Sequence, residues 1–175
     1  MQGPWGKAKR NRRMVRPTPR LDQMHRLVGS VFGTGFILEK VLGSHTGSGT
    51  VGAIVALPPA IVVGEWLGWQ GQVVAAMVVV IISVWTTSRL VDEAGDAGWI
   101  VIDEAAGVFV AVVGLPLWPE AVFAWVVFRA ADIFKGAAPG VGLAERLHGG
   151  VGVTADDVVA GLYGLAAGHL LRALL

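Results

Sequence analysis

The chain has 175 residues, of which 54% are hydrophobic and only 15% are charged, whereas soluble domains carry about 25% charged residues. This length fits one domain, and the composition excludes intrinsic disorder and argues against a globule surrounded by water. Because there is no cysteine, disulfides, thiolate zinc sites and phosphatases with a cysteine nucleophile are also excluded.

The charges are unevenly distributed along the chain. Residues 1–26 contain 8 of the 14 Lys and Arg residues and a single acid, whereas the other 149 residues contain 6 basic and 12 acidic ones. We interpret residues 1–28 as a basic, flexible cytoplasmic tail that either stays solvated or lies on anionic lipid. Prolines and polar residues follow the basic cluster where a signal peptide would be apolar, so we expect no cleaved leader.

Two long uncharged segments come next, over residues 41–64 and 66–88. Each exceeds the roughly 20 apolar residues that cross a bilayer as a helix. The first segment begins with glycines and serines, so we expect a helix only from about Thr50 to Glu65, kinked or broken at Pro58-Pro59. We expect the chain to reverse at Gly68 and a second helix to run over residues 72–87.

The second half of the chain predicts helices over residues 100–114, 120–135 and 155–175, with a Gly-rich loop over residues 136–152. No strand-like alternation occurs, so we predict an all-α fold. It is a compact bundle of about five to six apolar helices, embedded in or associated with a membrane. The middle two helices span about 22 Å, less than the roughly 30 Å hydrocarbon core, so they sit half-immersed or inside the bundle.

If the N-terminus is cytoplasmic and successive helices cross the bundle in alternating directions, most of the charged residues of the helices lie at the inner surface. Three tryptophans, Trp66, Trp69 and Trp118, fall near the outer turns, as interface anchors do, although ordinary packing is the alternative. The residues expected at the inner surface are Thr50, Asp103, Glu104, Arg129, Asp132, Lys135, Asp156 and Asp157.

Asp103 and Asp157 each precede a stripe of small residues on one helix face. The stripe after Asp103 lies at i+4, i+8 and i+11, and the glycines after Asp157 lie at i+4, i+7 and i+11. Small residues allow close helix contact, so facing stripes would bring the two carboxylates together, and oxygen ligands at close quarters suit Mg²⁺. The alternative is that Asp103 and Asp156 are caps or first-turn acids that favour the helix dipole.

Two further groups are candidates for phosphate binding. Arg129 and Asp132 lie at i, i+3, which indicates either a surface ion pair or a phosphate clamp beside a metal ligand, with Lys135 as an added charge. Residues 48–52 form a Gly-rich helix start of the kind that approaches phosphate, here through Thr50 and Gly52. It is not a P-loop, because no lysine follows in the required place.

At these residues the sequence resembles the phosphatidylglycerophosphatase A family. Residues 32–35 and 49–52 resemble the family's N-terminal Gly-rich segment, and residues 100–107, with Asp96 upstream, resemble its I-V-I-D-E-x-x-G signature. Residues 128–135 resemble F-R-x-x-D-x-x-K-P, and residues 148–161 resemble G-G-x-G-V-x-x-D-D-x-x-A-G. Two positions depart from the pattern: Ser48 and Gly136 stand where the family has proline.

The resemblance implies a magnesium-dependent lipid phosphatase, with residues 29–175 as its domain. Its substrate would be phosphatidylglycerophosphate and its products phosphatidylglycerol and phosphate, at the cytoplasmic side of a bacterial inner membrane; no nucleic-acid partner is expected. Nine residues match the family's motifs by position, and their division into roles is our hypothesis. It assigns Asp103, Glu104, Asp156 and Asp157 to catalysis, Asp103, Asp132 and Asp157 (or Asp156) to the metal, and Thr50, Gly52, Arg129 and Lys135 to the substrate phosphate.

Two other interpretations remain open. The acids could serve packing or cation passage in a non-catalytic membrane scaffold or a transporter-like protein, although a transport route needs polar groups near the bilayer midplane. A related phosphatase could act on another phosphomonoester, which the departure at Gly136, beside Lys135, keeps open.

Overall fold

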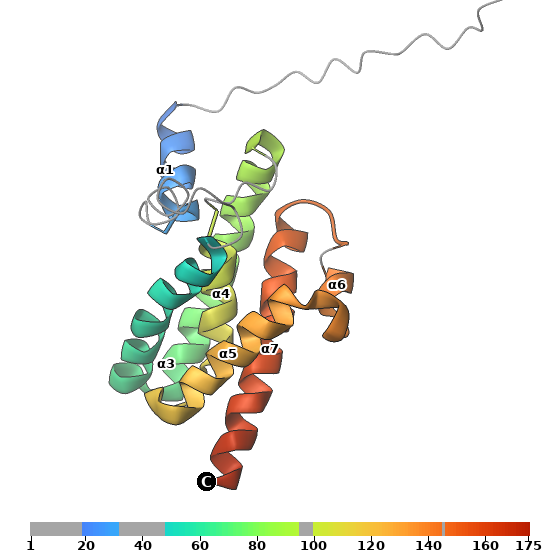
Figure 1. Ribbon diagram of the computed structural model, residues 1–175. Coiled ribbons are helices and arrows are strands. Elements are labelled where there is room, and N and C mark those ends of the chain that lie inside the picture. Colours follow the sequence, from blue (N-terminus) through green and yellow to red (C-terminus); the bar gives the residue numbers. More distant parts are fainter. Residues whose placement is uncertain (1–18, 32–47, 95–99, 145) are drawn as a thin grey trace, which may run out of the picture.

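Helices make up nearly all of the structure, a computed structural model that describes residues 19–31, 48–94, 100–144 and 146–175 (Figure 1). The described residues contain no strand, which confirms the predicted all-α class. The α-helices are α1 (Pro19–Gly29), α3 (Ser48–Ala94), α4 (Ile102–Ala111), α5 (Val122–Ile133), α6 (Val141–Ala144) and α7 (Gly150–Leu174), with a π-helical turn at Leu117–Ala121 and a 3-10 turn at Lys135–Ala137.

Helix α3 is a hairpin of two antiparallel halves, residues 48–67 and 69–94 (Figure 1). The chain reverses at Gly68, whose φ of 68° lies in the left-handed region that glycine adopts without strain. Across the hairpin, Gln72 Nε2 donates a hydrogen bond of 3.1 Å to the Ala60 carbonyl. The predicted reversal at Gly68 is therefore confirmed.

The predicted break at Pro58-Pro59 is wrong. The helix continues through both prolines, and Gly68 is the only residue of α3 with a non-helical backbone. Two prolines deprive the carbonyls of Ile54 and Val55 of their helical donors, but these two residues lie on the exposed side of the helix. The opposite side packs into the core and keeps the helix in place through the buried alanines Ala53, Ala56 and Ala60.

Helix α4 lies in the middle of the bundle and contacts α3, α5 and α7 (Figure 1). Seven of its 10 residues are buried, so this short helix is a core element, which is one of the two placements that its length left open. Phe128 of α5 is fully buried in the same core. The start of α4 is thereby fixed relative to three other helices.

The small residues that follow Asp103 and Asp157 allow α7 to pack so closely on its neighbours that backbone atoms of the helices come into contact. A Cβ atom on Gly161 would lie 2.6 Å from the Gly107 carbonyl oxygen, and one on Gly164 would lie 2.5 Å from the Ala124 carbonyl oxygen. Only glycine fits at such distances, so α7 approaches α4 and α5 as closely as their backbones permit. The facing stripes bring Asp103 and Asp157 to the same end of the bundle.

Helix α7 begins earlier than predicted, at Gly150, and the short helix α6 lies within the predicted Gly-rich loop. The expected helix start at residue 155 is therefore wrong. Gly149, with φ of 71°, turns the chain, and a Cβ on Gly150 would collide with the backbone nitrogen of Ser88 in α3. Because Asp156 then lies in the second turn of α7, it is not a cap.

Part of the predicted basic tail is also helical. Residues 19–28 belong to α1, whose His25 ring lies 4.1 Å from the ring of Trp85 in α3. The Gly29 carbonyl accepts a hydrogen bond of 2.8 Å from the Val101 amide, just before α4. Residues 1–18 lie outside the described residues.

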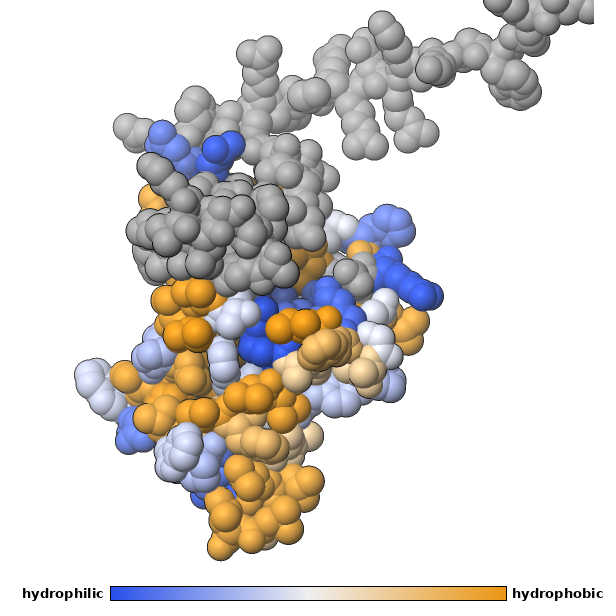
Figure 2. Space-filling model, viewed as in Figure 1, coloured by the Kyte–Doolittle hydropathy of each residue, from blue (hydrophilic) through white to orange (hydrophobic). Residues whose placement is uncertain are grey.

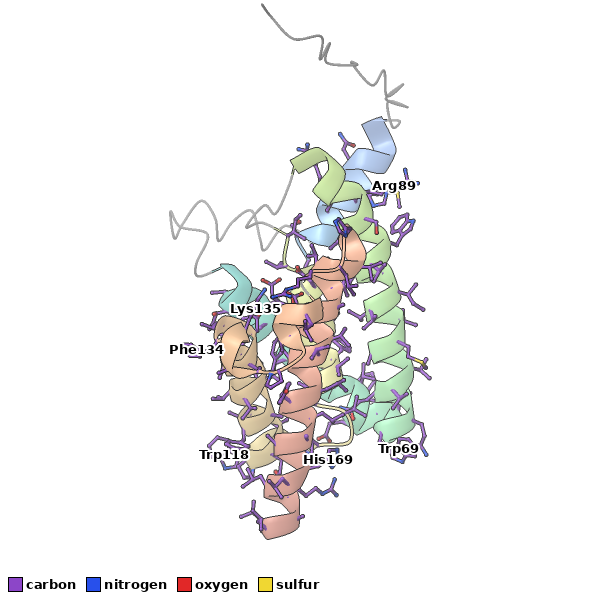
Figure 3. The ribbon with its side chains drawn as sticks, turned by 90° about the vertical axis from the view of Figure 1, so that its right-hand side faces the viewer. Trp69, Arg89, Trp118, Phe134, Lys135 and His169 are labelled. Carbon is purple, nitrogen blue, oxygen red and sulfur yellow. The ribbon has the colours of Figure 1, made fainter. Side chains whose placement is uncertain are left out.

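Large apolar side chains remain exposed over much of the exterior (Figure 2). Among the described residues, one helical stretch, Gly49–Leu90, is long and apolar enough to cross a membrane, and only 28% of its most apolar window is buried. Because this stretch reverses at Gly68, each half has about 20 residues, the length that spans roughly 30 Å of hydrocarbon. Trp69 and Trp118 are exposed at one end of the bundle, whereas Lys135 lies toward the other (Figure 3).

Candidate active site

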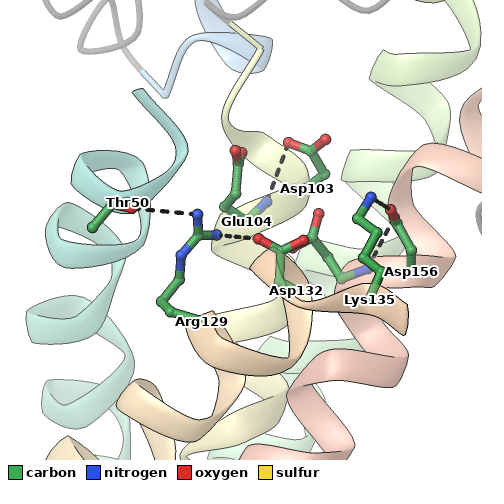
Figure 4. Close-up of polar contacts among 8 residues, drawn as sticks. Thr50, Asp103, Glu104, Arg129, Asp132, Lys135 and Asp156 are labelled. Carbon is green, nitrogen blue, oxygen red and sulfur yellow. Dashed lines mark hydrogen bonds and ion pairs between the residues drawn. The ribbon is translucent and has the colours of Figure 1, made fainter. Parts of the chain in front are cut away.

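The predicted polar residues converge at the end of the bundle where α3, α4 and α7 begin and α5 ends (Figure 4). Core packing of α4 and the glycine contacts of α7 determine this arrangement. The residues that meet there are Thr50, Asp103, Glu104, Arg129, Asp132, Lys135, Asp156 and Asp157.

Arg129 connects α5 with the start of α3. Its guanidinium lies 2.8 Å from Asp132 Oδ2 through Nη1, and Nη2 donates a 3.4 Å hydrogen bond to Thr50 Oγ1 (Figure 4). The Arg129 and Asp132 side chains are only 10% and 14% exposed, so the interpretation as a surface ion pair is wrong. A buried guanidinium whose second hydrogen bond is long is well placed to bind phosphate.

Lys135 pairs with Asp156 of α7. The two atoms, Nζ and Oδ2, are 2.6 Å apart, and Asp156 Oδ1 accepts a 3.0 Å hydrogen bond from the Asp157 amide. Burial raises the pKa of Asp156, and the ammonium of Lys135 opposes this shift. Because both oxygens of Asp156 have partners, Asp157 is the freer carboxylate of the pair.

Three buried acids, Asp103, Glu104 and Asp157, form the centre of the site. Burial raises the pKa of Asp103 well above its ordinary value, and the charge of Glu104 adds to the shift. Burial also raises the pKa of Asp157, with repulsion from Asp103 as the next cause, and it raises the pKa of Glu104 to about 7. Neighbouring carboxylates of this kind do not all ionise unless a positive charge joins them.

Several polar atoms of this centre have no partner. Glu104 Oε2, Asp157 Oδ1 and Arg129 Nε are buried and make no hydrogen bond within the described part of the chain. Native proteins pair nearly all buried polar atoms, so these atoms point to a ligand. Oxygen donors of carboxylates fit a hard cation such as Mg²⁺. Within the described ranges, no three acidic or histidine side chains are grouped closely enough to hold a metal ion as they stand.

The structure places Gly49, and not the predicted Gly52, beside the acids. A Cβ atom on Gly49 would collide with Glu104 Oε1 and lie 3.1 Å from Arg129 Nη2, so Gly49 borders the acids. Gly52 instead packs on Val101, whose Cβ would be 2.8 Å from an added Cβ. Sequence reasoning missed Gly49, although it directly precedes Thr50 at the helix start. Residues 32–35 and Asp96 of the family motifs lie outside the described residues.

An all-α bundle with buried carboxylates beside a buried arginine and a lysine is suited to an enzyme of phosphoryl chemistry, in which positive groups stabilise phosphate oxygens. The comparison of the sequence with family models is consistent with this class. Residues 27–172 match the model of phosphatidylglycerophosphatase A. The chain therefore belongs to the phosphatidylglycerophosphatase A family, a family of phosphoric monoester hydrolases, as its motifs indicated.

Individual relatives extend this result. The chain is 32% identical over 126 residues to phosphatidylglycerophosphatase A of Escherichia coli, covering 70% of this chain and 71% of the relative. It is 28% identical over 147 residues to the protein of that name in Haemophilus influenzae, covering 82% and 85%. It is also 33% identical over 147 residues to a putative phosphatidylinositol-3-phosphatase of Bacteroides thetaiotaomicron, covering 78% and 86%. No solved structure matches the chain.

Proposed function

We propose that this protein is a magnesium-dependent phosphatase that hydrolyses phosphatidylglycerophosphate to phosphatidylglycerol and inorganic phosphate. The observation that carries the proposal is the acid centre beside Arg129 and Lys135, in which Glu104 and Asp157 each have a buried oxygen without a partner among the described residues. The family and two of the relatives support the same substrate.

Asp103, Asp132 and Asp157 would hold the Mg²⁺ ion. Asp157 is preferred over Asp156 because Lys135 and the Asp157 amide already engage both oxygens of Asp156. Bound there, the cation would neutralise the acids and polarise the phosphoryl group. The raised pKa values of Asp103 and Asp157 fit this role, since a cation removes the repulsion that contributes to them.

The chain's own residues account for the proton transfer and the charge. Glu104, with its pKa near 7, accepts a proton from the attacking water as the water oxygen bonds to phosphorus and the bond to the glycerol oxygen breaks. The glycerol oxygen leaves and takes up a proton from solvent, and Glu104 afterwards releases its proton to solvent. Arg129 and Lys135 stabilise the charge on the phosphoryl oxygens, and Thr50 orients the Arg129 guanidinium.

We place the enzyme in the bacterial inner membrane with the acid centre at the cytoplasmic surface. The exposed apolar side chains of α3 and the exposed tryptophans at the opposite end support insertion. The basic residues of positions 1–26 precede the end of the bundle that carries the acids, and an excess of Lys and Arg marks the cytoplasmic side. A phosphomonoester headgroup on the inner leaflet would reach a site at this depth.

A second candidate substrate is another phosphomonoester lipid, such as phosphatidylinositol 3-phosphate. The Bacteroides relative, which carries that activity in its name, is as similar to this chain as the Escherichia coli one. Gly136, which stands next to Lys135 where the family has proline, has free space beside it: an added Cβ would have no atom within 4 Å. The loop beside the proposed phosphate-binding residues is therefore open to a larger headgroup.

The test is phosphate release by the purified full-length protein in detergent. Phosphatidylglycerophosphate, phosphatidylinositol 3-phosphate and glycerol 3-phosphate are supplied separately, each with Mg²⁺ and with EDTA. We expect release from phosphatidylglycerophosphate that EDTA abolishes. Faster release from the inositol lipid would assign the second substrate, and no release from any of the three by a folded preparation would contradict the proposal.

A further inference from the structure

Two neighbouring cavities lie between α3, α4 and α7: one is at the end of the bundle away from the acid centre, and the other extends along the helices as far as Val158, the residue after Asp157. One is a polar pocket of about 420 Å³ between the α3 hairpin, the end of α4 and α7, with Glu65, Trp69 and Arg172 in its lining. The other is a groove of about 450 Å³ between the second half of α3, α4 and α7, lined only by apolar side chains such as Met77 and Leu165. Together they form a cleft with one polar and one apolar end.

Polar contacts determine which end of the groove is closed. Toward the acid centre, Ser83 Oγ and Thr154 Oγ1 are 2.8 Å apart, and Thr87 donates a 3.1 Å hydrogen bond to the Gly150 carbonyl, so α3 and α7 are joined there. At the other end the groove and the pocket are neighbours, because Val113 lines the groove and the next residue, Gly114, lines the pocket. A chain in the groove would therefore enter from the polar pocket.

The pocket offers groups of both charges. Arg172 uses one of its five donors in a 2.7 Å hydrogen bond to the Gly114 carbonyl, so its guanidinium is oriented and keeps donors for a ligand. The Glu65 carboxylate is exposed on the α3 side of the same pocket and makes no hydrogen bond or ion pair within the described residues. Trp69, 60% exposed, stands at this end of the bundle (Figure 3).

We propose that the pocket and the groove together bind one phospholipid with an ammonium headgroup. Its phosphate pairs with Arg172, its ammonium with Glu65, and one acyl chain lies along the groove between α3 and α7. The opposite charges of the pocket complement this zwitterion, and the apolar lining of the groove complements the chain. The inference rests on the proposed membrane location.

This lipid is distinct from the substrate. Asp103 and Gly114 lie at opposite ends of α4 and the turn that follows it, and Figure 3 shows His169 and Trp69 at the end opposite Lys135. The helical part from Asp103 to Ala111 alone corresponds to about 12 Å. The hydrogen bond between Ser83 and Thr154 closes the groove near the start of α7.

Native mass spectrometry of the full-length protein in detergent tests this proposal. The protein is mixed with dioleoyl-phosphatidylethanolamine or dioleoyl-phosphatidylglycerol, and the fraction that retains one lipid is measured. We expect preferential retention of the ethanolamine lipid, at least a tenfold weaker retention in Arg172→Gln, and loss of the preference in Glu65→Gln. The matched control, Arg146→Gln, removes an exposed arginine outside the pocket and should bind as the wild type does.

Arg172→Lys keeps a positive charge. It should therefore retain the lipid if the loss of charge is what weakens retention in Arg172→Gln. Equal retention in Arg172→Gln and the wild type, or retention of neither lipid by the wild type, would overturn the proposal. Asp103→Asn, which removes a catalytic acid, should still retain the lipid. A folded protein that retains the lipid but releases no phosphate would therefore contradict the proposed function and leave this site in place.

Discussion

Two buried polar regions of this bundle obey opposite rules. In the α3 hairpin, Gln72 is 3% exposed, and both ends of its amide have partners: Nε2 donates to the Ala60 carbonyl at 3.1 Å and Oε1 accepts from the Gly114 amide at 2.7 Å. In the acid centre, Glu104 and Asp157 each keep a buried oxygen without a partner in the described structure. The first region is complete within the chain, whereas the second requires a ligand.

This difference distinguishes buried polar side chains that stabilise the fold from buried polar side chains that bind a ligand. A satisfied buried amide fixes the hairpin and the turn after α4 without any cofactor. The acids, in contrast, destabilise the fold wherever they ionise without a counter-charge, as their raised pKa values indicate. Burial of a polar side chain therefore does not by itself identify a ligand site. The distinguishing feature is whether its polar atoms have hydrogen-bond partners within the protein.

The largest expected effect is the loss of activity in Asp103→Asn. Turnover of phosphatidylglycerophosphate should fall about a thousandfold, because the variant removes a charge that holds the cation and the transition state. Helical content should stay the same, and in EDTA at pH 8 the unfolding temperature should not fall, since the change relieves repulsion with Asp157. Circular dichroism and phosphate release measure both, and near-normal turnover would exclude a metal role for Asp103.

The second-largest expected effect is a dependence of the free energy of unfolding on pH, which the acid centre produces. The pKa of Glu104 is about 7 in the folded protein against 4.5 ordinarily, so the folded state binds this proton more tightly. Without divalent cations, the free energy of unfolding should therefore fall as pH rises from about 4.5 to about 7, by on the order of 3 kcal/mol. Chemical unfolding in EDTA measures it, and Glu104→Gln should make the curve less steep without abolishing the fall, because the pKa values of Asp103, Asp156 and Asp157 are also raised. Stability that rises over this interval would contradict the assignment.

A smaller effect is expected in the hairpin. Gln72→Met keeps the shape of the side chain but leaves the Gly114 amide without its acceptor, which should cost about 2 kcal/mol of unfolding free energy. The dependence of stability on Mg²⁺ should remain as in the wild type. Gln70→Met, at an exposed glutamine two residues earlier, is the matched control and should be neutral. Equal stability of the two variants would show that the buried amide does not fix the turn.

The smallest effect concerns Thr50. Its hydrogen bond to Arg129 is long, at 3.4 Å, so Thr50→Val should raise KM only several-fold and leave kcat within about twofold. Steady-state kinetics with phosphatidylglycerophosphate would measure this. A large loss of kcat would instead assign Thr50 a direct contact with the reacting phosphate.

Much of this arrangement was predictable from local sequence. The reversal at Gly68 follows from a glycine between two apolar runs, and the meeting of Asp103 with Asp157 follows from the small residues after each of them. The eight site residues were named because they are the polar groups that the helix order brings to one end.

Other features depend on contacts between distant segments. Buried alanines on one side of α3 keep the helix intact through Pro58 and Pro59, and the close approach of Gly150 to Ser88 sets the start of α7. The pairing of Lys135 with Asp156, which leaves Asp157 free, connects residues 21 positions apart. No pattern within either segment encodes these contacts.

The most direct test of the central claim, that buried and mutually repelling acids form a cation-dependent centre, is the unfolding temperature of the full-length protein as Mg²⁺ is titrated at pH 8. A ligand that binds only the folded state at 100 times its Kd stabilises it by about 2.7 kcal/mol. The account predicts a rise of the unfolding temperature that saturates in the wild type and is absent in Asp103→Asn and Asp157→Asn. No rise in the wild type, or the same rise in all three proteins, would contradict it.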